Sequence, residues 1–115
     1  MNLRNVLSDK LPEELNSLTY ENVFQVFQDY LSEDDVIEIV KLKHGYAALL
    51  WYEKNHEYTN MEAFTSPVEL ADFLAGQHEI FHEMQLDGNG SRDLTEEEKA
   101  PLIKASQELL AKCFE

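Results

Sequence analysis

The chain has few basic residues: nine Lys and Arg stand against 23 Asp and Glu, which gives a formal net charge of −14 with neutral histidines. This excess of carboxylates repels the phosphates of DNA and RNA and the anionic surface of membranes, so we expect no direct binding to either. It favours cationic partners, either metal ions or the basic surface of another protein. A well-solvated, self-repelling surface is the simpler explanation of the same charge.

Cysteine and long apolar runs are also scarce. A single cysteine, Cys113, excludes an intramolecular disulfide and a zinc site built from cysteines, and its apolar surroundings predict a small core residue. The longest apolar run, 46–52 (YAALLWY), is far shorter than the ~20 residues that cross a bilayer. The first ten residues contain no recognisable secretory signal. We therefore expect a soluble, cytoplasmic protein with one domain, 1–115.

Few glycines are present, and none stands in a phosphate-binding loop. The four lie at positions 45, 76, 88 and 90, outside any strand–GxGxxG–helix or Walker arrangement. Neither Ser106 nor Cys113 has a base at a spacing that indicates nucleophilic catalysis. The sequence therefore predicts a protein that is not an enzyme.

The first third of the chain has the periodicity of helices. Thr19 is suited to cap a helix, and Pro12 to begin a shorter helical turn with Glu13 and Glu14 favourable near its start. The apolar residues of the longer helix recur at helical spacing: Val23, Phe24, Phe27, Tyr30 and Leu31.

The pattern then changes to that of strands. Segments 36–43 (VIEIVKLK) and 46–53 (YAALLWYE) are rich in β-branched and aromatic residues, and His44-Gly45 fits a two-residue hairpin turn. A second turn at Lys54-Asn55 and an edge strand at 56–59 would complete a three-stranded meander, which is more stable than a lone hairpin.

Helical periodicity returns after Ser66 and Pro67. Ser66 as N-cap, Pro67 at the first helical position and Glu69 together form a start signal. Gly76 costs ~1 kcal/mol relative to Ala if the helix continues through it. A last helix follows the acidic segment 87–98. This order predicts an α+β fold: N-terminal helices, a central antiparallel β-hairpin or three-stranded meander, and two C-terminal helices.

Residues 87–98 (DGNGSRDLTEEE) resemble the 12-residue calcium loop of EF-hand proteins. The resemblance covers this segment alone and implies a single calcium ion held by oxygen ligands. The ligands it implies are Asp87, Asn89, Ser91, the backbone carbonyl of Asp93, and a bidentate Glu98. Arg92 departs from the family pattern, which has glycine at the sixth place. A polar connection in which Thr95 and Glu98 cap the last helix explains the same residues without calcium.

A second metal motif precedes the loop. Residues His78 to His82 (HEIFH) fit H-E-x-x-H, in which two histidines one helical turn apart bind zinc and Glu79 acts as a general base. A zinc hydrolase needs a third protein ligand, and a Glu of the last helix, such as Glu108, is a candidate. A histidine at the boundary of the core, paired with a carboxylate, is the competing explanation.

Small acidic proteins without catalytic motifs often occupy a basic site on another protein, as immunity proteins, nuclease inhibitors and DNA mimics do. The sequence predicts such an interaction protein, with a calcium binder as the second hypothesis and a zinc hydrolase as the third. Trp51, Tyr52 and Tyr58 are candidate aromatic anchors, or they pack beneath the helices. The predicted partner-binding carboxylates are Glu33, Asp34, Asp35, Asp72, Glu79 and Glu83.

Overall fold

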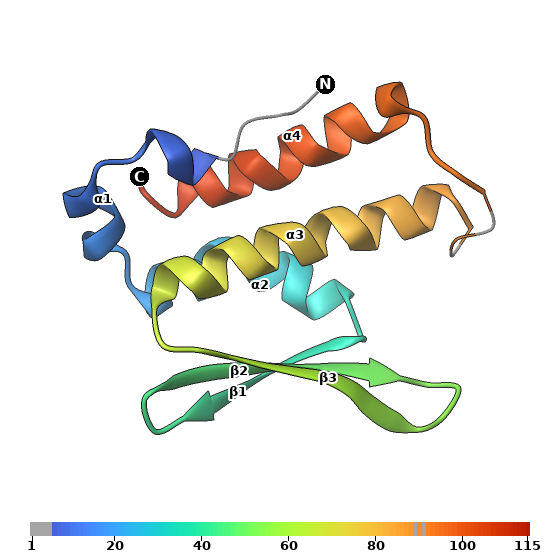
Figure 1. Ribbon diagram of the computed structural model, residues 1–115, viewed down its shortest axis with the longest axis horizontal. Helices are drawn as coiled ribbons and strands as arrows, with labels where there is room; N and C mark the ends of the chain where they lie inside the picture. The colour runs from blue at the N-terminus through green and yellow to red at the C-terminus, as the bar shows by residue number, and fades with distance from the viewer. Residues whose placement is uncertain (1–5, 89, 91) are drawn as a thin grey trace.

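The computed structural model describes residues 6–88, 90 and 92–115, and their elements are drawn in Figure 1. The elements in chain order are a 3-10 turn η1 (Val6–Asp9), α1 (Pro12–Ser17), α2 (Tyr20–Glu33), β1 (Ile37–Leu42), β2 (Gly45–Tyr52), β3 (Glu57–Phe64), α3 (Pro67–Leu86) and α4 (Glu96–Lys112). The strands form one antiparallel sheet in the order β1-β2-β3. The predicted α+β fold, with a three-stranded meander between N-terminal and C-terminal helices, is confirmed.

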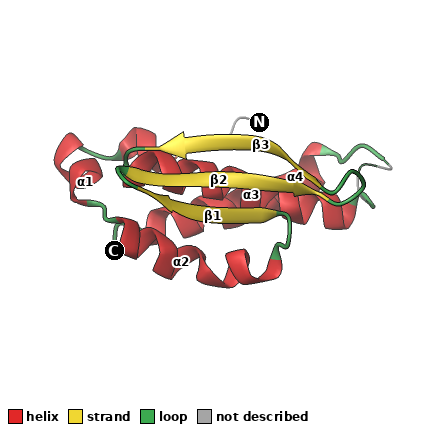
Figure 2. Cartoon of the chain, turned by 90° about the horizontal axis from the view of Figure 1, so that it is seen from below, coloured by secondary structure: helices red, strands yellow, loops and turns green. Residues whose placement is uncertain are grey.

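The helices lie on one side of the sheet (Figures 1 and 2). Helices α2 and α3 are next to the sheet, and α4 packs against α3 on the side away from it. No helix of the described chain covers the opposite face of the sheet, as the view in Figure 2 shows. No helix in residues 6–88 or 92–115 is long and apolar enough to cross a membrane.

The predicted helix starts are confirmed by their caps. The side chain of Thr19 accepts a hydrogen bond from the Asn22 amide at 3.2 Å, and Ser66 accepts one from the Glu69 amide at 3.2 Å. These bonds satisfy amides that a helix cannot pair internally. Helix α3 runs through Gly76, where an added Cβ would meet nothing within 4 Å.

The first hairpin turn is displaced by one residue from its predicted position. Leu42 pairs with Gly45, so the two turn residues are Lys43 and His44. Gly45 has a φ of +156°, and a Cβ there would collide with the carbonyl oxygen of Phe64 on the neighbouring strand. Glycine is therefore required by the close approach of β3 rather than by the turn.

The third strand is longer than predicted and begins after a four-residue turn. Strand β3 continues to Phe64, although its residues before Phe64 are exposed and give no apolar alternation. Leu50 pairs with Asn60 and Trp51 with Tyr58, so Thr59 is the extra residue of a β-bulge. The polar side chains and this bulge are typical of an edge strand.

The core lies between α2, α3, α4 and the inner face of the sheet. Its fully buried members include Val23, Phe27, Leu70, Leu74 and Leu110. Cys113 is buried with them, as predicted, and burial raises the pKa of its thiol to about 11. A buried, protonated thiol of this kind is unreactive.

Candidate functional site

A cleft lies between the inner face of the sheet and helix α3. Its apolar part, of about 480 Å³, is enclosed by the end of α2, the start of β1, the end of β2 and the second half of α3. Val36, Tyr52, Ile80 and Met84 line it, yet between 43% and 48% of the surface of each is exposed. Glu33 and Asp35 also belong to the lining, which has no Lys, Arg or His among its described residues.

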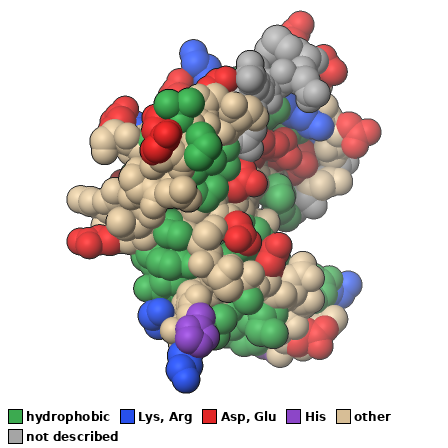
Figure 3. Space-filling view, turned by 60° about the vertical axis from the view of Figure 1, so that its left-hand side comes forward, with side chains coloured by type: hydrophobic (Ala, Val, Ile, Leu, Met, Phe, Trp, Pro, Cys, Tyr) green, Lys and Arg blue, Asp and Glu red, His purple; other side chains and the backbone are tan. Residues whose placement is uncertain are grey.

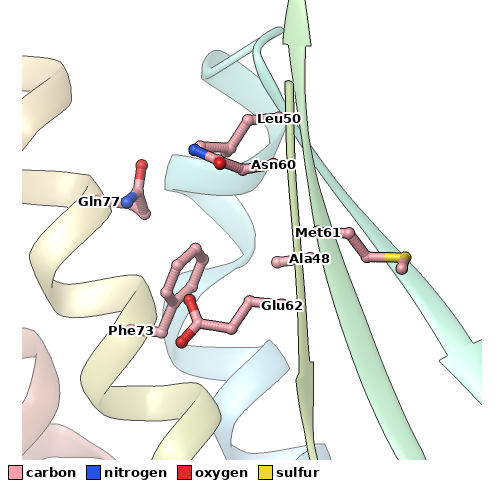
Figure 4. A pocket seen from close by; sticks show the side chains of 7 residues that line it. All are labelled: Ala48, Leu50, Asn60, Met61, Glu62, Phe73 and Gln77. Carbon is pink, nitrogen blue, oxygen red and sulfur yellow. The ribbon is translucent and has the colours of Figure 1, made fainter. Parts of the chain in front are cut away.

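The polar part of the cleft adjoins the apolar part and shares Leu50 and Gln77 with it. It has a volume of about 490 Å³ and lies between α3 and strands β2 and β3. Figure 4 shows Gln77 of α3 facing Leu50 and Asn60 of the sheet, with Glu62 beside the ring of Phe73. The two parts together are named the α3 cleft below, and Glu62 of the polar part adds a carboxylate to those of the apolar part.

Helix α3 forms one wall of this cleft because it is apolar on two sides. Leu70 and Leu74 face the core, whereas Ile80 and Met84, four residues apart, follow one another along the cleft. The sequence predicted no binding role for Val36, Ile80 or Met84: it placed Val36 at the start of a strand and Met84 on the apolar stripe of the helix. Apolar residues on more than one side of a long helix are the signal that could have indicated this surface.

The structure corrects one member of the predicted acidic surface. Asp34 is buried, and both of its carboxylate oxygens are used within the chain: the Tyr30 hydroxyl donates to one at 2.7 Å and the Val36 amide to the other at 3.0 Å. Burial and the hydrogen bond to Asp34 raise the pKa of the Tyr30 hydroxyl. Asp34 therefore stabilises the junction of α2 and β1, and Glu33 and Asp35 remain as the exposed carboxylates.

The second predicted acidic group lies away from the apolar part of the cleft. Asp72 is exposed on the first half of α3. Glu79 and Glu83 are half-buried. Burial, and next a hydrogen bond to Glu83, raise the pKa of Glu79, whereas Lys99 of α4 lowers it. The last two carboxylates thus lie toward α4, so the structure divides the predicted acidic residues between two surfaces.

The three aromatic candidates are also divided. Tyr52 lines the α3 cleft. Trp51 and Tyr58, on the opposite face of the sheet, pack edge to face with ring centroids 5.1 Å apart. The Tyr58 hydroxyl donates to Glu38 at 2.6 Å. Tyr52 and, beside it, Trp51 therefore border the cleft, whereas Tyr58 does not.

The loop that resembles an EF-hand holds a cation of its own, the guanidinium of Arg92. Its two terminal nitrogens donate to the two carboxylate oxygens of Glu98 at 3.1 and 2.7 Å. Glu98 also accepts from the Thr95 amide at 3.0 Å and completes the capping box of α4. The hydrogen bond from Arg92 has the largest effect and that from the Thr95 amide the next, and they lower the pKa of Glu98 to about 2. The oxygens of the implied bidentate calcium ligand are therefore already engaged.

Of the remaining implied calcium ligands, Asp87 and Asp93 belong to the described residues. A carboxylate oxygen of Asp87 accepts from the Gly90 amide at 2.8 Å, which closes a turn. Asn89 and Ser91 lie outside the described residues. Within residues 6–88, 90 and 92–115, no group of three or more His, Cys, Asp or Glu is placed to hold a metal ion.

The first histidine of the H-E-x-x-H motif makes contacts within the core. His78 is 8% exposed, its Nδ1 lies 2.7 Å from the Ser106 hydroxyl, and its ring packs against those of Tyr30 and His82. Burial, and next the proximity of His82, lower the pKa of His78 to about 4. Glu108, the suggested third ligand, instead lies 4.0 Å from Lys104 on α4. The boundary-histidine explanation fits this geometry, with a serine in place of the expected carboxylate.

One partnership was missed by the sequence analysis, which found no base for Ser106. His78 is 28 residues away in sequence and becomes its neighbour because α3 and α4 pack side by side. Ser106 is only 1% exposed, so a substrate atom has no access to its hydroxyl. The hydrogen bond between His78 and Ser106 links α3 to α4.

The α3 cleft therefore combines exposed apolar side chains with carboxylates, and it is the strongest candidate site in the described residues. Comparison with family models, curated proteins and solved structures gave no match to this chain.

Proposed function

We propose that this protein acts by binding a basic, amphipathic segment of another protein in the α3 cleft, as an interaction protein of the inhibitor, immunity or DNA-mimic type. One observation carries the proposal. Four apolar side chains remain nearly half exposed beside two carboxylates, in a lining without a cation among its described residues.

The apolar part of the cleft supplies the affinity in this proposal. Each square ångström of apolar surface removed from water contributes ~25 cal/mol, and exposed apolar patches of this kind commonly mark interaction sites. Ile80 and Met84 on α3 face Val36 and Tyr52 from the sheet side, so apolar side chains of a partner would be held from both sides.

The carboxylates orient the bound segment and accelerate its association in this proposal. Glu33 and Asp35 border the apolar part, and Glu62 lies in the polar part. A Lys or Arg on the partner can pair with each of them while its apolar residues enter the cleft. The net charge of −14 attracts such a segment over a longer range and accelerates its association at low salt.

Selection from a random-peptide display library at low salt tests this proposal. We expect enrichment of peptides that combine spaced apolar residues with Lys or Arg. Their affinity should fall at least about tenfold in Met84→Gln, because a polar group then lines the cleft. Leu86→Gln is the matched control: Leu86 is 48% exposed on the same helix but outside the cleft lining. Equal loss in both variants, or no enrichment, would overturn the proposal.

A second pair of variants tests the carboxylates. Glu33→Gln with Asp35→Asn should weaken the selected peptides more than Glu13→Gln with Glu21→Gln, which removes the same charge from exposed helical positions outside the cleft. The difference should shrink as salt rises because screening weakens the exposed pairs. If both double variants bind alike, the acidic border of the cleft has no specific role.

A further inference from the structure

The face of the sheet that points away from the helices is apolar and uncovered in the described chain, and it is named the outer face here. Alternation along the strands assigns ten residues to it: Glu38, Val40, Leu42, Gly45, Ala47, Leu49, Trp51, Tyr58, Met61 and Ala63. Figure 4 shows Met61 pointing away from α3, and its surface is 76% exposed. The one charged member, Glu38, is bonded to Tyr58.

The charge of the sheet differs sharply from that of the rest of the chain. Residues 37–64 contain four acidic and three basic residues, a net charge of −1. The other 87 residues contain 19 acidic and six basic residues and carry −13. In Figure 3, Lys or Arg and His side chains gather at the end of the sheet, and most of the visible acidic side chains lie on the helical side. The outer face is therefore where two copies of this acidic chain meet with the least repulsion.

We infer that the outer face binds a second copy of this chain, sheet against sheet, in a reversible two-fold dimer. The two ends of the sheet carry opposite charge. Lys43 and His44 form the β1–β2 turn, whereas Glu53 and Lys54 in the β2–β3 turn, with Glu57 after it, give the other end a net charge of −1. A two-fold axis in the plane of the interface and perpendicular to the strands places the basic turn of each copy over the acidic end of its partner.

The size of the outer face determines how strong this association is. Three strands about 4.8 Å apart, the longest with eight residues of about 3.3 Å each, cover roughly 14 by 26 Å, or about 360 Å². A stable interface buries about 800 Å² on each partner. The dimer is therefore weak and depends on concentration. It leaves both α3 clefts open, because the helices of the two copies point away from each other.

Sedimentation over a concentration series tests the dimer. Between about 10 µM and about 1 mM, the mean mass of the wild-type chain should rise from 13.3 kDa toward twice that value. Met61→Lys should stay at 13.3 kDa throughout. Asn60→Lys is the matched control, because it adds the same charge at the neighbouring residue on the opposite face (Figure 4). A wild-type chain that stays monomeric, or a Met61→Lys chain that associates like wild type, would overturn the inference.

Charge exchange tests the orientation. Lys43→Glu should weaken the dimer, and adding Glu57→Lys should restore it, because the exchanged charges meet again across the two-fold axis. Asn55 is bonded to Glu57, so the fold of the double variant is checked by its melting temperature. A folded double variant that associates no better than Lys43→Glu would exclude this arrangement.

Failure of this dimer and failure of the proposed cleft function are distinguishable. Asn60 and Met61 both border the polar part of the α3 cleft, but the Asn60 side chain faces α3 and that of Met61 points away from it (Figure 4). Asn60→Lys should therefore weaken a selected basic peptide more than Met61→Lys does, whereas Met61→Lys alone should abolish the dimer. Salt separates them as well. It weakens peptide binding. In the dimer, salt screens both the few pairs between the turns and the repulsion between two layers of −13 each, and the repulsion involves far more charges. The dimer should therefore strengthen from about 10 mM to 150 mM salt, as the Debye length falls from about 30 to 8 Å.

Discussion

The helical layer and the sheet of this protein present opposite surfaces to their surroundings. The helical segments carry nearly all of the net charge, whereas the sheet is almost neutral and leaves one apolar face uncovered in the described residues. The α3 cleft lies where the two layers meet and takes apolar lining from both. Charge would thus separate the two proposed kinds of association: attraction of a basic partner at the cleft, and contact between copies at the neutral face.

The two layers also differ in how much of the fold depends on their side chains. Phe27 of α2 is fully buried, whereas Met61 on the outer face is 76% exposed. We expect Phe27→Ala to lower the free energy of unfolding by about 3–5 kcal/mol, from lost burial and the cavity left behind. Met61→Ala should change it by less than about 0.5 kcal/mol. Urea denaturation of dilute protein measures both, and similar losses would contradict the division between core and outer face.

One glycine in the sheet and one in the helical layer extend this comparison of how the two layers respond to substitution. Gly45→Ala should destabilise the protein by about 3 kcal/mol, because the new Cβ would collide with the Phe64 carbonyl and force the strands apart. Gly76→Ala should stabilise it by about 0.5–1 kcal/mol, because the site is open and Ala favours helix. Thermal and urea unfolding of the two variants provide the measurement. A tolerated Gly45→Ala would mean that β3 is not held close to that residue.

Acid should act on the helical layer through His78, whose pKa falls from 6.5 to about 4 on folding. The unfolded chain then binds a proton at this histidine more readily than the folded chain does. The contribution of neutral His78 to the free energy of unfolding is therefore complete above pH 6.5 and is lost as the pH falls toward 4. We expect a loss on the order of 2 kcal/mol. His78→Asn, which can retain the bond to Ser106, should have a flatter profile of unfolding free energy across this window.

Acid also reduces the negative charge of a chain with 23 Asp and Glu, and thereby relieves their mutual repulsion. The informative quantity is therefore the difference between wild type and His78→Asn at each pH, since both chains share those carboxylates. Parallel profiles from pH 7 to pH 4 would show that His78 does not resist protonation in the folded protein.

Elements with a local signal in the sequence were predicted well. Thr19, Ser66 and Thr95 each cap a helix through a side-chain bond to an amide three residues ahead, and such bonds depend on neighbouring residues alone. The third strand was predicted too short, at 56–59 instead of Glu57–Phe64, because its length is decided by pairing with β2 and not by its own residues. Long-range pairing overrides local propensity in an edge strand of this kind.

The candidate site was predicted only in part for the same reason. Glu33 and Asp35 were identified as acidic residues, but their role depends on Val36, Ile80 and Met84, which the fold brings beside them from separate elements. Asp34 could not be told from its neighbours by sequence, since its burial follows from the position of Tyr30 one helical turn earlier. Charge is visible in a sequence, whereas apolar exposure requires the fold.

The smallest expected effect is that of calcium on the melting temperature. Its measurement tests whether the acidic helical layer binds a metal ion. A melt in EDTA and one with millimolar calcium should give the same melting temperature, with magnesium as control. The reason is that the Arg92 guanidinium already occupies both oxygens of Glu98, and an ion would have to displace it. A ligand well above its dissociation constant would stabilise the folded chain by a few kcal/mol, so a site would be evident.

Arg92→Gly makes this test sharper, because it restores the glycine of the EF-hand pattern and frees Glu98 at once. If Arg92 is what excludes calcium, this variant gains a calcium-selective rise in melting temperature that wild type lacks. Arg92→Lys is its control, since it keeps a positive charge without the planar fork that binds both oxygens. A calcium-selective rise in wild type would contradict the account of Arg92 as the loop's own cation, and the helical layer would then hold a metal site.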